Sequence, residues 1–428
     1  MAPKFRITTS FDSFLHKCNG TEITSTLTQV NCKPGIDYPC KIDYDAIDET
    51  YCPWTHEHID YLNSLPHGRP IRAGKATQVS FLCWQWKTWD EIFFPCILTH
   101  DRTYLLYCYD DYWLNHMGII FKYDSKNQLY ELNSNIRVSH ENNEGPITFV
   151  GGWGNPSHFF GQYFSRYIVI ARNQSSFSNC GIIAFKMPSW QLKLLHDLFE
   201  PLEKNLSLID LTYFTPSHRN ILLLHTKNTI IFEDVPQWLG LQVSRAFFRE
   251  YLQSSVKSIF NISNTFRQSE YLFPSKMTNL IYLSRAYHET VHATNKNERR
   301  VLDYKDVAHL LYNLGFTIVF PENHTIISLQ KMLDNCEIVI ADPGSCNIHA
   351  LLSSTIKKLI LLGDTSLAKS RSHPSLRHIE WYASHIGRSL QICVGDESSG
   401  ARKVNLLQVP SLKYRDAIIK LFKASITK

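Results

Sequence analysis

The sequence predicts an α/β protein whose carboxy-terminal half contains a doubly wound parallel sheet. From Asn279 to Asp364, apolar runs of strand length alternate with segments in which apolar residues recur at helical spacing. Glycine, proline or polar residues follow each run. The runs are Leu280–Leu283, Phe316–Phe320, Ile338–Ile340 and Leu359–Leu362. Strands that alternate with helices along a chain form parallel sheets with the helices packed on their faces.

Residues typical of helix ends mark the helices between these runs. Asp303 is expected to cap the first helix, Asp306 to occupy its third position and Gly315 to end it. The apolar residues inside it recur at positions i, i+3, i+4 and i+7. A second helix is expected from about Thr325 to Asn335, and a short third helix follows the turn 341–347.

The residues that follow the apolar runs form the candidate site, because doubly wound sheets bind ligands at the carboxyl ends of their strands. They are Ser284, Arg285 and Glu322, together with the turn residues Pro343, Gly344, Ser345, Cys346 and Asn347. Free backbone N–H groups at the start of a helix suit a phosphate or diphosphate, whose charge Arg285 and Arg300 would neutralise. The alternative, that Gly-Ser only marks a turn, stays open. The chain contains neither a GxGxxG fingerprint nor a Walker P-loop, which disfavours a dehydrogenase and an NTPase.

The rest of the chain divides by composition and pattern. Residues 1–140 consist mainly of short strands and turns, and form a strand-rich region that belongs to, or is added to, the next domain. Residues 141–265 are expected to form a second α/β domain and a linker, with Tyr167–Ala171 among its strands and Pro188–Glu203 as a helix. The sheet described above is assigned to residues 266–410, and a last helix lies within 411–428.

His158 is the candidate catalytic residue of the middle region. It follows a glycine-rich loop, Gly151–Gly154, and begins a predicted helix. The positive end of a helix dipole favours the neutral form of imidazole, which can act as a general base. The alternative is a structural histidine that orients a loop.

Composition limits the protein's class. The chain has 428 residues, 44% of them hydrophobic, and a net charge of +5, which fits an anionic substrate but not a nucleic-acid partner. There is no run of about 18 apolar residues and no signal-peptide pattern. Eleven cysteines without a Cys-x-x-Cys motif indicate reduced thiols, and hence a cytoplasmic protein. Asp43 and Asp45 form an Asp-x-Asp pair that could hold a divalent cation.

Several short segments, taken in order and spacing, resemble glycosyltransferase family 61 across residues 145–395. The segments in question are Ile281–Arg285, Arg299–Asp306, Phe320–Glu322, Ser328–Gln330, Ile340–Ser345, Trp381–Gly387, and His158–Arg166 with the family's eight-residue step from histidine to arginine. The chain departs from the family at four positions. Pro343 replaces a histidine, His349 an asparagine, Asp303 an asparagine and Tyr304 a glutamate.

This resemblance implies a GT-B architecture, with two Rossmann-like domains facing a cleft. It also implies inverting sugar transfer from a nucleotide sugar, usually a UDP-sugar, without a bound metal or other cofactor. The expected acceptor is a glycan or lipid-linked glycan in capsule or lipopolysaccharide synthesis, and basic patches could attach the protein peripherally to the inner face of the membrane. His158 would be the base, and the strand-end residues would bind the donor. Two alternatives stay open: a metal-dependent transferase that uses Asp43 and Asp45, and a catalytically silent nucleotide- or glycan-binding module.

Overall fold

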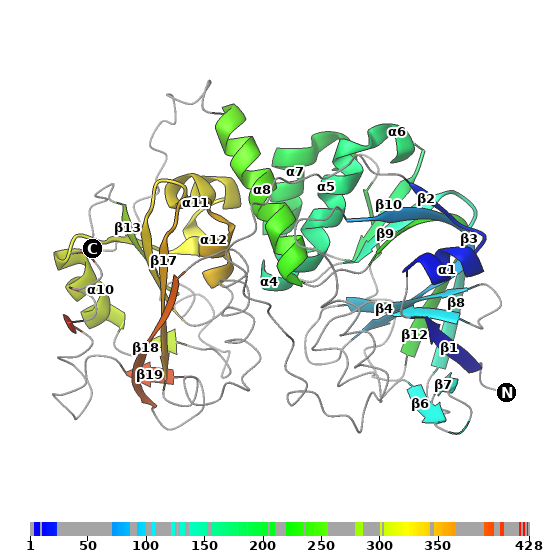
Figure 1. The fold of residues 1–428 in the computed structure, drawn as a ribbon, viewed down its shortest axis with the longest axis horizontal. Helices are drawn as coiled ribbons and strands as arrows, with labels where there is room; N and C mark the ends of the chain where they lie inside the picture. Colours follow the sequence, from blue (N-terminus) through cyan, green and yellow to red (C-terminus); the bar gives the residue numbers. More distant parts are fainter. Residues whose placement is uncertain are drawn as a thin grey trace. The chain divides into compact units, whose positions relative to one another are not determined.

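The computed structural model divides the chain into two compact units. Unit 1 comprises Met1–Lys33 and Pro39–Ser244, and unit 2 comprises Pro34–Tyr38 and Arg245–Lys428. The structure describes residues 4–8, 11–23, 71–85, 92–99, 104–107, 121–124, 126, 129–132, 137–151, 156–177, 179–185, 187–203, 206–209, 220–233, 237–255, 279–285, 300–301, 304–342, 346–364, 389–397, 403–405, 419–420, 423 and 426. Within these residues both units are mixtures of helices and sheets that contain parallel strands (Figure 1).

Unit 1 is built on one large mixed sheet. Its described strands follow the order β11-β10-β9-β12-β3-β4-β5-β1-β7-β6, with β2 paired to β3 and β8 paired to β12. Their bounds are β1 (Lys4–Thr8), β2 (Thr21–Ile23), β3 (Ala73–Gln85), β4 (Ile92–Thr99), β5 (Tyr104–Tyr107), β6 (Phe121–Asp124), β7 (Leu129–Leu132), β8 (Arg137–Asn143), β9 (Ile147–Gly151), β10 (Gly181–Phe185), β11 (Leu206–Ile209) and β12 (Asn220–Phe232). The long antiparallel pair β3–β12 joins the amino-terminal region to the middle region in one sheet.

The described helices of unit 1 lie between its strands along the chain. They are α1 (Phe11–Lys17), α4 (Pro156–His158), the π-helix η2 (Phe159–Tyr163), α5 (Phe164–Arg172), α6 (Gln174–Phe177), α7 (Ser189–Glu203) and the start of α8 (Gln237–Ser255). Helix α7 confirms the helix predicted over Pro188–Glu203. The unit boundary falls inside α8, between Ser244 and Arg245.

The strand predicted over Tyr167–Ala171 is wrong, because these residues form the second half of α5. The run contains β-branched residues, which favour strands, but a short apolar run fits a fully buried helix equally well. Tyr167, Ile168, Val169 and Ile170 are all buried, so this helix is covered on every side. Burial therefore decided between two local structures that the sequence pattern allowed.

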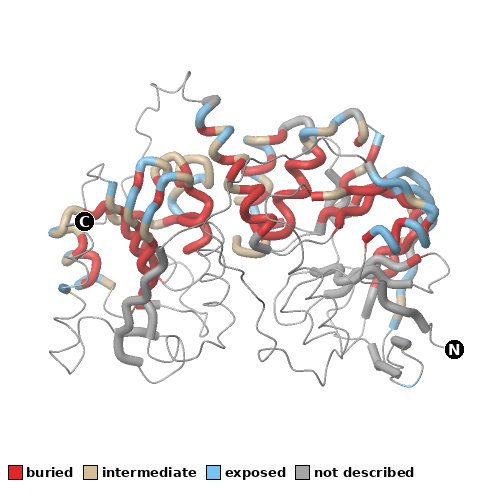
Figure 2. The backbone as a smooth tube through the Cα atoms, in the orientation of Figure 1, coloured by how far each residue is buried: buried red, intermediate tan, exposed pale blue. Residues whose placement is uncertain are grey.

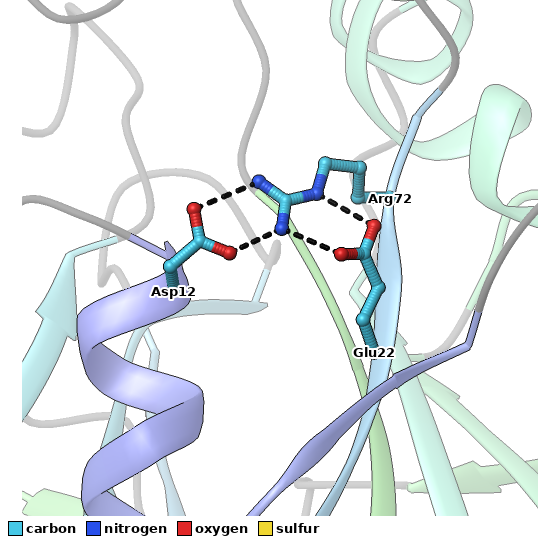
Figure 3. Close-up of polar contacts among 3 residues, drawn as sticks. All are labelled: Asp12, Glu22 and Arg72. Carbon is cyan, nitrogen blue, oxygen red and sulfur yellow. Dashed lines mark hydrogen bonds and ion pairs between the residues drawn. The ribbon is translucent and has the colours of Figure 1, made fainter.

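An ion-pair cluster connects the start of β3 to α1 and β2. The Arg72 guanidinium lies between two carboxylates, donating to both oxygens of Asp12 and to both oxygens of Glu22 (Figure 3). It also lies over the Phe11 ring, 5.4 Å from the ring centroid. Bidentate arginine–carboxylate contacts fix geometry as well as charge, so this cluster holds the amino-terminal elements against the sheet.

Unit 2 contains a second, smaller sheet. Its described strands follow the order β14-β19-β18-β17-β16-β13-β15, and the neighbours from β18 to β15 are parallel. The strands are β13 (Leu280–Leu283), β14 (Arg300–Val301), β15 (Thr317–Val319), β16 (Ile338–Ala341), β17 (Lys358–Asp364), β18 (Ser389–Glu397) and β19 (Lys403–Asn405). The helices are α10 (Tyr304–Asn313), the 3₁₀ turn η5 (Pro321–Asn323), α11 (Ile326–Leu333) and α12 (Asn347–Leu352). The four predicted apolar runs are all strands here.

The predicted helix ends in unit 2 are also confirmed where the structure describes them. Asp306 is the third residue of α10, and Gly315 follows the helix with a positive φ of 94°. The Thr325 hydroxyl caps α11 by accepting the Ser328 N–H at 3.2 Å. The predicted cap Asp303 lies outside the described residues.

One hydrophobic core cluster of unit 2 contains residues of α10 and of the sheet. Its buried members are Tyr282, Val301, Val307, Ala308, Leu311, Phe316, Ile340, Ile360 and Leu362. Figure 2 shows the buried stretches gathered in the central strands and in the helix faces that cover them. Among the described residues, no helix is both long enough and apolar enough to cross a bilayer.

Candidate functional site

The strand order of unit 2 creates a topological switch point between β13 and β16. After β13 the chain forms β14 at the far edge of the sheet and then β15 on one side of β13. It next forms β16 on the other side of β13 and continues to β17 and β18. The connections therefore diverge at β13 and β16, which are parallel neighbours. In open α/β sheets the crevice outside the carboxyl ends of two such strands is the usual ligand site. Ser284 and Arg285 follow β13 there, and Asp342 follows β16.

A buried carboxylate connects the two strand ends. Asp342 accepts hydrogen bonds from the Tyr282 hydroxyl at 2.6 Å, the Arg285 backbone N–H at 2.7 Å and the Ser284 hydroxyl at 3.3 Å. The Asp342 N–H donates to the Leu283 carbonyl at 3.0 Å. Asp342 is 2% exposed, so these bonds replace its contacts with water. The network fixes the backbone from which the Arg285 side chain extends.

Burial dominates the electrostatics of this carboxyl. It raises the pKa of Asp342 from 3.8 to about 6, against the opposing effects of the Tyr282 hydroxyl, the Arg285 backbone N–H, the Arg285 charge and the Ser284 hydroxyl. The pKa of Tyr282 is raised by its own burial and then by the Asp342 charge. Asp342 and Tyr282 are therefore a coupled buried pair, and the Arg285 guanidinium is close enough to act on it.

Two residues predicted from sequence, Arg285 and Glu322, act on the thiol of a third, Cys346. Burial raises the pKa of the Cys346 thiol to about 12, the Arg285 charge lowers it, and the charges of Asp342 and Glu322 raise it. The Cys346 thiol donates to the Asp342 carbonyl at 3.3 Å. The structure thus places Cys346 at the end of β16, where the charges of Arg285 and Glu322 act on its thiol.

The other residues predicted to bind the donor do not all lie near Arg285 in the described structure. Asn347 is buried at the start of α12, whereas Pro343, Gly344 and Ser345 lie outside the described residues. Arg300 belongs to β14, the edge strand on the far side of the sheet from β13. Five strand-to-strand steps of about 4.8 Å separate β14 from β13. The structure therefore does not place Arg300 at the switch point with Arg285.

Helix α12 is the short third helix that the sequence predicted after the turn. It contains only six residues, Asn347–Leu352. His349 within it is buried, and this burial lowers the pKa of the imidazole to about 4. Its backbone carbonyl accepts the Gln330 side-chain N–H of α11 at 3.1 Å. This short helix is a core element, which leaves Arg285 as the main source of positive charge among the described site residues.

His158 and Arg166 belong to unit 1 and have different environments. His158 ends α4 and is half-buried, with Nδ1 3.0 Å from Gln162 Oε1. Arg166 is buried, donates to the Val150 carbonyl at 3.0 Å and lies over the rings of Tyr163 and Phe232. The eight-residue spacing noted in the sequence thus joins a partly accessible histidine to an arginine that packs α5 against β9.

Sequence reasoning missed three residues that organise these sites: Tyr282, Asp342 and Gln162. Two signals were available in the sequence. Tyr282 is a tyrosine in an otherwise aliphatic strand, and Asp342 is an aspartate directly after another strand. Within the described residues, no group of three or more His, Cys, Asp or Glu side chains could hold a metal ion. Asp43 and Asp45 lie outside the part of the chain that the structure describes.

Comparison with known proteins gives no family assignment. No protein-family model matches the chain, and no curated protein matches it. One solved structure with partial similarity is the bacterial iron-containing dodecameric glycosyltransferase TibC from enterotoxigenic E. coli H10407. That match has 10% sequence identity and a TM-score of 0.26, and it covers 82% of this chain and 90% of the other. A similarity at this level supports no inference, so the proposals below depend on the residues of this chain.

Proposed function

We propose that the protein is an inverting glycosyltransferase of GT-B architecture that transfers a sugar from a UDP-sugar to a hydroxyl of a glycan or lipid-linked glycan. Unit 2 binds the nucleotide sugar, and unit 1 supplies the general base and the acceptor side. The reaction requires no bound metal, and the product belongs to a capsule or lipopolysaccharide type of polysaccharide. The sequence resemblance to glycosyltransferase family 61 supports this proposal.

The observation that carries the proposal is the switch point of unit 2. Doubly wound sheets usually bind ligands outside the carboxyl ends of the two strands at the switch point, which are β13 and β16 here. Arg285 extends from that edge, and its backbone is held by Asp342. A guanidinium can bind two oxygens of a phosphate in a fixed geometry. The site therefore suits the diphosphate of a nucleotide sugar.

The chemistry needs two contributions from the protein. A base removes the proton of the acceptor hydroxyl while its oxygen attacks the anomeric carbon, and positive charge stabilises the departing nucleoside diphosphate. His158 is the base in this proposal. Arg285 carries the charge at the leaving group, and Ser284, Cys346 and Asn347 shape the donor site beside it. Arg300, on the edge strand β14, is not part of this proposed set.

The first test is ligand-induced thermal stabilisation with UDP, GDP, CMP and ADP, each with and without EDTA. We expect stabilisation by UDP that persists in EDTA. Arg285→Ala should weaken UDP binding by about tenfold to a hundredfold, because it removes hydrogen bonds between charged groups worth about 1.5–3 kcal/mol. The matched control is Arg249→Ala, which removes a partly exposed arginine of α8 in the same unit and should leave UDP binding unchanged.

The other outcomes separate the alternatives. No stabilisation by any nucleotide would overturn the donor-site assignment. Stabilisation that requires a divalent cation would favour the metal-dependent reading with Asp43 and Asp45. UDP binding without turnover of any UDP-sugar, tested with a panel of glycan acceptors, would favour a silent binding module.

A further inference from the structure

The side chain of Gln162 contacts the proposed base directly. Its Oε1 lies 3.0 Å from Nδ1 of His158, which is four residues earlier in the chain. Gln162 is 4% exposed, whereas His158 is half-buried. An amide oxygen can only accept a hydrogen bond, so this contact is a hydrogen bond only in the tautomer that carries the proton on Nδ1. In a neutral imidazole the other nitrogen, Nε2, then holds the free electron pair.

A π-helix sets the position of this contact. Gln162 belongs to η2, where the Phe164 N–H donates to the Phe159 carbonyl five residues back. All five residues of η2 are buried. Phe159 and Phe160 pack against the Trp190 ring of α7, at centroid distances of 5.3 and 6.1 Å. π-Helical turns inside α-helices occur frequently at functional sites.

The first part of α8 fixes the backbone of the π-helix. The Ser244 hydroxyl donates to the Phe160 carbonyl at 2.7 Å. Gly240 lies so close that a Cβ on it would be 1.9 Å from the Gly161 carbonyl oxygen. Only a residue without a side chain permits this approach. The segment that carries Gln162 is therefore held by ring packing on one side and by close backbone contact on another.

We propose that Gln162 is a positioning residue for the reaction: its amide oxygen holds the Nδ1–H tautomer of His158 and leaves Nε2 as the nitrogen that accepts the acceptor's proton. This inference rests on the proposed function for its catalytic part. During transfer the acceptor oxygen forms a bond to the anomeric carbon, and its proton moves to Nε2. The bond from that carbon to the diphosphate breaks, and its electron pair leaves on the phosphate oxygen. The opposite tautomer would present Nε2–H to the hydroxyl and could not take the proton.

The test is the tautomer of His158, measured by ¹H–¹⁵N correlation spectra of protein labelled with ¹⁵N-histidine at a pH where the ring is neutral. His158→Gln identifies the signal by its loss. We expect the Nδ1–H form in the wild type and in Gln162→Glu, whose side chain can still accept. The methionine of Gln162→Met cannot accept a hydrogen bond from Nδ1–H. In this variant we expect the Nε2–H form, which predominates for imidazole side chains in water, in place of the Nδ1–H form.

Turnover supplies the second readout. Gln162→Met should lower kcat by about tenfold to a hundredfold, within the range that general base catalysis contributes, with UDP affinity unchanged. Gln162→Glu should recover part of that loss. The matched control is Gln191→Met, which removes another buried glutamine of unit 1 and should change neither the tautomer nor kcat.

The tautomer of His158, the catalytic role of Gln162 and the proposed function are tested by different results. An Nε2–H form in the wild type would overturn the proposal even if Gln162→Met failed to fold, because that measurement needs no variant of Gln162. The expected tautomers with unchanged kcat in a folded Gln162→Met would overturn the catalytic part. Absence of transfer from every nucleotide sugar would instead refute the proposed function, and the tautomer would still show whether Gln162 holds His158 as inferred.

Discussion

Replacing Asp342 with asparagine should change how the stability of unit 2 depends on pH. Burial raises the pKa of this carboxyl from 3.8 to about 6 in the folded chain, so the folded state binds its proton more tightly than the unfolded state. A raised pKa contributes stability that is fully present below the unfolded value and is lost as the pH rises through the folded value. Asp342 should therefore stabilise the wild type at about pH 3–4 relative to neutral pH.

The magnitude follows from the two pKa values. They differ by about 2, because 6 minus 3.8 is 2.2. At about 1.4 kcal/mol for each pKa unit, this corresponds to about 3 kcal/mol. Asparagine does not titrate, so the free energy of opening of wild type minus Asp342→Asn should fall by about 3 kcal/mol over the whole titration, and by about 2 kcal/mol of this between about pH 4 and pH 7. The buried His349 has the opposite effect in acid, and subtracting the variant cancels its contribution.

Hydrogen exchange of the β13 and β16 amides, corrected for intrinsic exchange at each pH, reports the local opening free energy of this sheet. The control is Asp306→Asn, which removes an exposed carboxyl of α10 and should alter the pH dependence by less than about 1 kcal/mol. A difference between wild type and Asp342→Asn that stays constant from about pH 4 to pH 7 would refute the reasoning. It would mean that the carboxyl has the same proton affinity in the folded and unfolded states.

Two further substitutions test the packing and the caps. Gly240→Ala should lower the thermal midpoint, because overpacking against the Gly161 carbonyl costs about 1–3 kcal/mol or more, above the gain of about 1 kcal/mol from helix propensity. The control Gly145→Ala, which has room for a Cβ, should stay within about 0.5 kcal/mol, and equal midpoints for the two variants would contradict the close contact. Thr325→Ala should destabilise α11 by about 1 kcal/mol in hydrogen exchange, because the Ser328 N–H loses its acceptor, and Thr325→Ser should restore it. Equal exchange in both Thr325 variants would show that the cap contributes nothing.

Local signals predicted the elements of unit 2 well. Apolar runs bounded by glycine, proline and polar residues gave all four strands, because strands buried on both faces need continuous apolar sequence. Thr325 and Gly315 marked helix ends for reasons that depend only on their neighbours in the chain: a hydroxyl that accepts an N–H, and a backbone that tolerates a positive φ. The candidate site at the strand ends was predicted from the same local signals, because the residue that follows each strand can be read from the sequence, and its role as a ligand site stays a prediction.

Contacts between distant segments could not be predicted in this way. Nothing in the pattern around Tyr282 shows that its hydroxyl meets Asp342, because 60 residues separate them and the strand order of the sheet brings them together. The same strand order places β14, which contains Arg300, at the far edge of the sheet. The pairing of β3 with β12 likewise joins segments that show no common pattern in the sequence.

The sequence alone thus determined the strands β13, β15, β16 and β17 and the helices between them, and that Ser284 and Arg285 follow a strand, whereas β14, β18 and β19 were not predicted. These properties depend on side-chain chemistry over a few neighbouring positions. Only the tertiary structure decided that the apolar segment Tyr167–Ala171 is a helix, that Asp342 lies buried against Arg285, and that Gln162 faces His158 from a π-helix. Burial and strand order settle such questions, and both are properties of the whole packed unit.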